Sequence, residues 1–71
     1  MFNRNLFRAK VVAMGLTLEE VAKRMGINPS TLDRKMSGNS DFTRNEIQIL
    51  RKMLSMTADD CDNIFFAEEL T

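Results

Sequence analysis

The chain contains no histidine, no tryptophan, no tyrosine and a single cysteine, Cys61. Histidine is the side chain that most often exchanges protons near neutral pH, and without one Cys61 has no obvious base to activate its thiol. We therefore expect neither an enzyme nor a bound cofactor. A lone cysteine cannot form an internal disulfide, so a reducing, cytoplasmic location fits best.

A long apolar run is also missing. No segment approaches the roughly 20 apolar residues that a membrane helix needs. The first ten residues, MFNRNLFRAK, lack the apolar segment and the small-residue cleavage site of a secretory signal. A length of 71 residues with 44% hydrophobic residues predicts one globular domain, residues 1–71, with a small core. Nothing indicates a membrane or a small-molecule ligand as a partner.

The chain has no net charge either, but its charges are unevenly distributed. All ten Lys and Arg lie between Arg4 and Lys52. Residues 1–58 contain only five acidic side chains and carry a net charge of +5, whereas the last thirteen residues carry −5. Because binding to phosphate depends on the local field of the contacting face, overall neutrality does not exclude nucleic acid as a partner.

Helix boundaries follow from capping signals. Three pairs have the spacing of a reciprocal N-terminal cap: Thr17 with Glu20, Thr43 with Glu46, and Thr57 with Asp60. A glycine follows three of the segments, at Gly15, Gly26 and Gly38. Helices are predicted from Asn3 or Asn5 to about Met14, from Leu18 to Met25, from Pro29 to Ser37, from Thr43 through Leu54, and from Thr57 to about Phe65. The expected fold is all-α, a compact five-helix bundle, with Leu6, Ala9 and Ala13 as the buried edge of the first helix.

The segment from Thr17 to Gly38, TLEEVAKRMGINPSTLDRKMSG, is the most informative part of the sequence. It predicts two helices of about eight residues joined by a turn of three to four, which is the helix-turn-helix unit. Gly26 suits the left-handed end of the first helix, and Asn28 with Pro29 suits the start of the second. Leu32 and Met36 would face the interior.

These residues resemble the helix-turn-helix of the Cro and lambda-type repressor family. The matching string is T17-x-E19-E20-x-A22-x-x-x-G26-I27-x-x-S30-T31-L32. The chain is most similar to small bacteriophage Cro-like repressors, through S-T-L-x-x-K-M at 30–36, F-T-x-x-E-I at 42–47 and I-F-F at 64–66. The resemblance implies a lambda-repressor-like bundle that binds a palindromic double-stranded DNA operator as a homodimer. Many members have glutamine where this chain has Leu18, so that contact with the DNA backbone is lost or replaced.

The predicted helix at 29–37 would be the recognition helix. If Leu32 and Met36 face inward, the opposite side carries the candidate base readers: Ser30, Asp33, Arg34 and Ser37. Arg34 is the strongest of them, because arginine reads the O6 and N7 atoms of guanine with two parallel hydrogen bonds. Asp33 has two equally weighted interpretations, acceptance from a cytosine amine and pairing with a nearby arginine. Lys35 is expected to extend over the edge of the core to a phosphate.

Other polar residues are candidates for contacts with the DNA backbone. They lie at the starts of predicted helices and in the loop after the recognition helix: Thr17, Asn28, Thr31, Asn39, Ser40 and Arg44, together with Lys35. The start of a helix offers free backbone amides and a positive dipole, which favour phosphate. A solvated charge is an equally good interpretation of Arg44.

The C-terminal segment, residues 58–71, is expected to form a dimerisation element. Its apolar residues Ile64, Phe65, Phe66 and Leu70 exceed what so small a chain is expected to bury, and an apolar patch left exposed usually marks an interface. Asp59, Asp60 and Asp62 are not expected to bind a metal, because acids in a first helical turn favour the helix dipole. In a dimer, two recognition helices would lie one DNA turn apart, about 34 Å.

Two functions follow from these features. The first is a sequence-specific transcriptional repressor that occupies an operator and excludes polymerase. The alternative is a protein-binding module, such as an antirepressor or adaptor, that keeps the fold without binding DNA. The alternative is favoured by the zero net charge, by Leu18 and Asp33 on the expected DNA side, and by the Phe-rich tail. A basic outer face on the recognition helix would favour the first function, and a neutral or acidic one the second.

Overall fold

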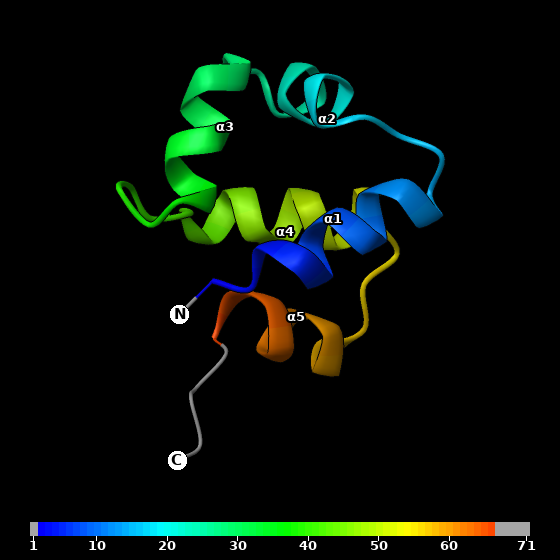
Figure 1. The fold of residues 1–71 in the computed structure, drawn as a ribbon. Coiled ribbons are helices and arrows are strands. Elements are labelled where there is room, and N and C mark those ends of the chain that lie inside the picture. The colour runs from blue at the N-terminus through cyan, green and yellow to red at the C-terminus, as the bar shows by residue number, and fades with distance from the viewer. Residues whose placement is uncertain (1, 67–71) are drawn as a thin grey trace.

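Five helices make up residues 2–66, the part of the chain that the computed structural model describes, and no strand occurs in that range (Figure 1). The helices are α1 (Arg4–Ala13), α2 (Leu18–Met25), α3 (Pro29–Met36), α4 (Arg44–Met53) and α5 (Ala58–Phe65). The radius of gyration is 11.3 Å, close to the roughly 11 Å of a compact domain of this length. Within residues 2–66 no helix combines the length and apolarity needed to cross a bilayer.

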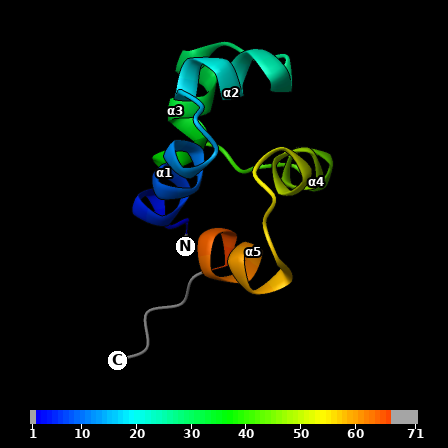
Figure 2. The ribbon, with the colours of Figure 1, turned by 90° about the vertical axis from the view of Figure 1, so that its right-hand side faces the viewer.

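The helices pack in an arrangement that exposes α2 and α3. Figure 2 shows α2 and α3 together at the top, α1 and α4 on opposite sides beneath them, and α5 at the bottom. Contacts join α2 to α3, α1 and α4, and α1 also packs on α5. The prediction of a compact all-α bundle of five helices is therefore confirmed for residues 2–66.

All three predicted capping pairs form. At the start of α2, the Thr17 hydroxyl accepts from the Glu20 N–H at 3.2 Å, and the Glu20 carboxylate accepts from the Thr17 N–H at 3.1 Å. The same reciprocal bonds begin α4 and α5. Each satisfies two backbone donors that the helix itself leaves free.

Replacing Thr57 with alanine should therefore destabilise the domain by about 1 kcal/mol, the usual cost of losing an N-cap side chain. Thr57→Ser keeps the oxygen that accepts from the Asp60 N–H at 3.1 Å and should stay close to wild type. Urea denaturation followed by far-ultraviolet circular dichroism measures both. Equal losses for the two variants would show that the hydroxyl is not the group that matters.

The core differs from the prediction on α1. Phe7 and Val11 point inward and are 0% and 2% exposed, whereas Leu6 is 43% exposed and Ala9 and Ala13 also lie on the surface. The predicted buried edge was wrong because the larger pair at i and i+4 occupies the interior, which turns the helix by one residue relative to the prediction. The buried core residues are Phe7, Val11, Val21, Ala22, Leu32, Met36, Leu50, Leu54, Met56, Cys61, Ile64 and Phe65.

A cluster of aromatic rings joins both ends of the described chain to the loop after α3. Phe2 stacks on Phe42 with ring centroids 4.9 Å apart, and Phe65 meets Phe42 edge-on at 5.3 Å. The Asn3 N–H also donates to the Ile64 carbonyl at 2.7 Å. The loop from Gly38 to Thr43 is therefore held in place by packing as well as by its backbone.

Candidate nucleic-acid interface

The turn between α2 and α3 is three residues long, Gly26 to Asn28. Gly26 ends α2 in the left-handed conformation, with φ of +76°, which is unstrained only for glycine. The Ile27 N–H then donates to the Ala22 carbonyl at 3.0 Å. Pro29 supplies the first residue of α3, and the Asn28 side chain makes no capping hydrogen bond. This turn directs α3 away from α2 at a steep angle, as Figure 1 shows.

The buried and exposed residues of α3 lie on opposite faces of the helix, as the sequence predicts. Leu32 and Met36 are 1% and 3% exposed and join the core. The four candidate base readers, Ser30, Asp33, Arg34 and Ser37, are all exposed. The outer face of α3 is therefore polar and open to solvent along its whole length.

Asp33 has an ionic partner. Its carboxylate lies 3.6 Å from the Arg4 guanidinium, which comes from the start of α1. Both side chains are well exposed, so this pair adds little stability. Of the two interpretations of Asp33, the structure agrees with pairing to a nearby arginine. Arg4 was missed in the sequence because it is distant along the chain and belongs to no motif.

Lys35 does not extend to the surface. Its ammonium group lies 3.0 Å from the Glu46 carboxylate, donates to the Asp41 carbonyl at 2.9 Å and sits 5.9 Å from the centre of the Phe42 ring. The Lys35 and Glu46 side chains are only 10% and 15% exposed. In this conformation the charge is already paired and directed at the start of α4, so Lys35 is not presented to a phosphate.

The pairing with Lys35 contributes to a lowered pKa of Glu46. Burial raises the pKa of its carboxyl group, but hydrogen bonds from Thr43 and the ammonium group of Lys35 outweigh burial and lower the pKa below its ordinary value of 4.5. The carboxylate is thus ionised at neutral pH and fixes Lys35 at the base of α3. This contact orients the helix and the following loop.

The remaining candidates for phosphate contacts do not form one cluster. Asn39 and Ser40 lie in the loop after α3 and Arg44 at the start of α4, whereas Thr17 lies before α2. Figure 1 shows these two regions on opposite sides of the molecule. Asn28 and Thr31 flank the start of α3, with Asn28 exposed and Thr31 half-buried. The Thr17 oxygen is engaged with Glu20 in the cap.

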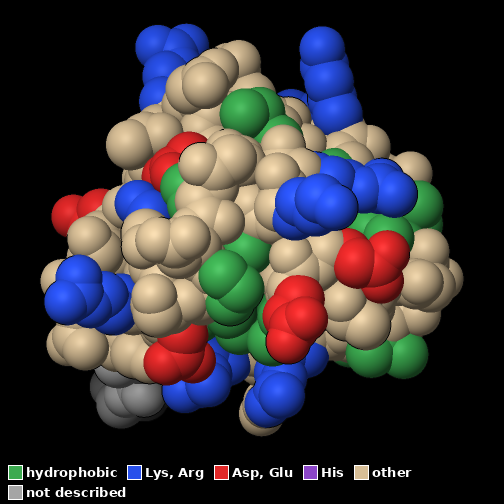
Figure 3. All heavy atoms as spheres, turned by 90° about the horizontal axis from the view of Figure 1, so that it is seen from above, with side chains coloured by type: hydrophobic (Ala, Val, Ile, Leu, Met, Phe, Trp, Pro, Cys, Tyr) green, Lys and Arg blue, Asp and Glu red, His purple; other side chains and the backbone are tan. Residues whose placement is uncertain are grey.

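The surface around α2 and α3 carries charges of both signs. Figure 3, which looks onto these helices, shows basic side chains around the edge of the face with acidic side chains between them. On the outer face of α3 Arg34 is next to Asp33, and Lys35 is neutralised by Glu46. Of the two cations of α3, only Arg34 takes part in no ion pair within residues 2–66.

Two of the predicted interface residues are buried in the core of the domain. Ile64 is 1% exposed and Phe65 is 8% exposed, so both belong to the core of α5 and are not available to a partner. The prediction was wrong for them because Phe2 and Phe42 extend the core around Phe65. Phe66 is 60% exposed, as an interface residue would be. Leu70 and the rest of the acidic tail lie outside the described residues.

No family model matches the chain, and neither the curated proteins nor the solved structures include a match to it. Its function must therefore be inferred from its own residues and their arrangement.

Proposed function

We propose that the chain is a sequence-specific DNA-binding transcriptional regulator of the Cro-like, lambda-repressor-like type, with α2 and α3 as its helix-turn-helix. It would act without catalysis, by occupying a palindromic operator as a homodimer in the cytoplasm and excluding polymerase. The observation that carries the proposal is the exposed α3. This helix follows a three-residue turn and presents a polar outer face. It also holds the guanidinium group of Arg34, which takes part in no ion pair within residues 2–66.

The groups around α3 support a groove-binding role for it. Arg34 lies exposed in the last turn of α3, and an arginine on a helix that enters the major groove can reach the edge of a guanine. Ser30 and Ser37 on either side can donate or accept hydrogen bonds. Lys35 contributes indirectly, because its pairing with Glu46 fixes the loop that carries Asn39 and Ser40.

Arg34→Ala is expected to reduce discrimination between operator and unrelated DNA by about 1–3 kcal/mol, the contribution of one bidentate contact to a base. Binding is measured by fluorescence anisotropy with duplexes from the region upstream of the gene, over a series of salt concentrations. Arg51→Ala removes the same charge from the last turn of α4, beside Cys61 on α5, and is the matched control. Wild-type affinity must fall steeply with salt, because phosphate contacts release counterions.

The near-neutral outer face of α3 favours a second candidate function. With Asp33 exposed beside Arg34 and Lys35 withdrawn, this face suits a protein partner that binds a helix of mixed charge. The same titrations separate the two candidates. A chain that binds no duplex even at low salt, or whose affinity does not change with salt, would be a protein-binding module rather than a repressor.

A further inference from the structure

The solvent-facing side of α1 carries several apolar residues beside the polar Asn5. Leu6 is 43% exposed and Val12 is 73% exposed, and the small residues Ala9 and Ala13 lie exposed between them. The outward side of a surface helix normally carries its charged residues. On α1 the charged side chains stand at the edges of this face instead, and the two alanines leave the helix backbone open to close approach.

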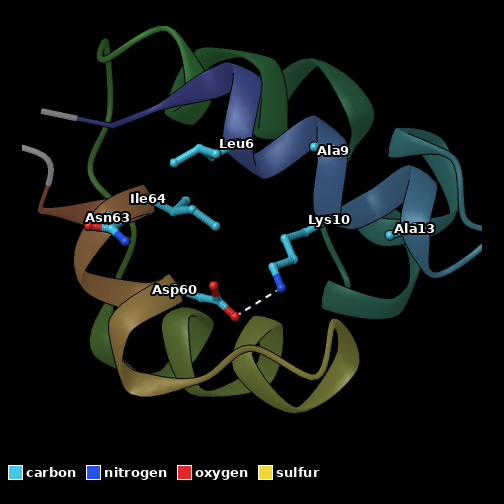
Figure 4. Close-up of a pocket in the computed structure, with 7 residues that line it drawn as sticks. All are labelled: Leu6, Ala9, Lys10, Ala13, Asp60, Asn63 and Ile64. Carbon is cyan, nitrogen blue, oxygen red and sulfur yellow. Dashed lines mark ion pairs between the residues drawn. The ribbon is translucent and has the colours of Figure 1, made fainter.

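Beside this face, α1 and α5 enclose a hollow of about 280 Å³ (Figure 4). Leu6, Ala9, Lys10 and Ala13 line it from α1, and Asp60, Asn63 and Ile64 line it from α5. We call this surface, together with Val12, the α1–α5 strip: the exposed residues Leu6, Ala9, Val12, Ala13 and Asn63 and the half-buried Lys10 and Asp60. It contains two of the exposed large hydrophobic residues of the described chain.

The charges within the strip are already neutralised. The Lys10 ammonium group lies 2.9 Å from the Asp60 carboxylate, across the hollow between the two helices. The pKa of the Asp60 carboxyl group is lowered, first by the hydrogen bond from the Thr57 N–H and second by the hydrogen bond from the Lys10 ammonium group. The strip can therefore be covered by another surface without leaving an uncompensated charge in the contact.

The two edges of the strip carry opposite charges. Arg8 lies on the far edge of α1, where it lines a second hollow with Val12 and Leu16. Asp59 is exposed on α5, one turn before Asn63 and therefore on the same side of that helix. No ion pair within residues 2–66 involves either side chain.

We propose that the α1–α5 strip is the surface through which two copies of the chain pair. A two-fold axis that places α1 of one copy against α5 of the other brings Arg8 to Asp59 twice, once on each side of the axis. A purely acidic partner would attract Arg8 but repel Asp59, and a purely basic partner would do the reverse. A second copy carries both charges and can pair each edge with the opposite charge. This inference rests on the proposed function, because the strip would be the interface of the proposed homodimer. The two copies would pair whether or not DNA is bound.

Sedimentation equilibrium of the full chain without DNA tests the pairing, from micromolar to several hundred micromolar protein. The wild type is expected to dimerise with rising concentration. Ala9→Glu should weaken the dimer roughly tenfold or more, because it introduces a carboxylate at the centre of the contact. Ala9 is exposed and glutamate is a good helix former, so the variant should melt as the wild type does. Gln48→Glu adds the same charge to an exposed position of α4 and should dimerise normally.

Charge reversal tests the orientation of the two copies. Arg8→Glu and Asp59→Lys should each weaken the dimer, since either variant opposes like charges at both edges, and the double variant should restore association. A wild-type chain that stays monomeric throughout, a dimer unaffected by Ala9→Glu, or a double variant that does not recover would overturn the proposal. Because DNA is absent, these results are independent of those for Arg34→Ala.

Discussion

Phe7→Ala is expected to remove about half of the domain's free energy of unfolding, or more. Phe7 is 0% exposed and its ring lies 5.3 Å from that of Phe2 and 6.3 Å from that of Phe42. Truncating a buried phenylalanine costs about 3–5 kcal/mol, the lost transfer energy plus the cavity left behind. A domain of this length has a total stability of only about 4–10 kcal/mol.

Thermal and urea denaturation, followed by circular dichroism, measure this loss. Phe66→Ala is the matched control, because the same ring is removed from a position that is 60% exposed, and its effect should stay within about 0.5 kcal/mol. Leu6→Ala distinguishes the observed face of α1 from the predicted one. If Leu6→Ala were the more damaging of the two α1 variants, Leu6 rather than Phe7 would be the core residue.

Local signals in the sequence predicted the helices well. Each capping pair lies within four residues, so its geometry is fixed by the chain itself and does not depend on packing. Thr17 with Glu20 is one example, and both members are found where the spacing puts them. The end of α2 at Gly26 is likewise a property of one residue, since its φ of +76° is readily adopted by glycine.

The orientation of α1 could not be predicted in the same way. Its sequence offers two apolar edges, Leu6 with Ala9 and Ala13, and Phe7 with Val11, and helical periodicity alone does not choose between them. The choice is made by partners distant in the sequence, because Phe2 and Phe42 complete a site for the Phe7 ring. Ile64 and Phe65 were misassigned for the same reason, since the residues that bury them lie elsewhere in the chain.

The outer face of α3 was predicted from spacing, but the state of its charges was not. Leu32 and Met36 define the inner side by helical geometry, which leaves Asp33 and Arg34 outside. The partners Arg4 and Glu46 come from other helices, and no spacing within α3 points to them. Tertiary contacts therefore decide how many free cations α3 presents.

Lys35→Met is expected to destabilise the domain by about 2 kcal/mol, between the cost of breaking an exposed ion pair and that of breaking a fully buried one. The reason is that Glu46, only 15% exposed, would lose its ammonium partner at 3.0 Å. Adding Glu46→Gln should recover much of the loss, because glutamine can still complete the cap with Thr43 and leaves no unpaired charge. Lys52→Met, at an exposed position of α4, is the control and should have little effect.

The loss in Lys35→Met should depend on pH. The pKa of Glu46 is lower in the folded chain than its ordinary value of 4.5, so its ionised form stabilises the fold above that pH. This stabilisation disappears as the pH falls through the lowered value, and the wild type and Lys35→Met should then converge. Urea denaturation at a series of pH values from neutral to acid measures the difference between them.

The Lys35→Met variant also tests whether Lys35 stabilises the fold or contacts a DNA phosphate. If Lys35 is structural, Lys35→Met should leave the salt dependence of DNA binding unchanged under conditions where the variant is fully folded. A phosphate contact would instead reduce the slope of log affinity against log salt by about 1 and leave stability nearly intact. That second pattern would mean that Lys35 leaves Glu46 when DNA binds, and that α3 presents two cations to the groove rather than one.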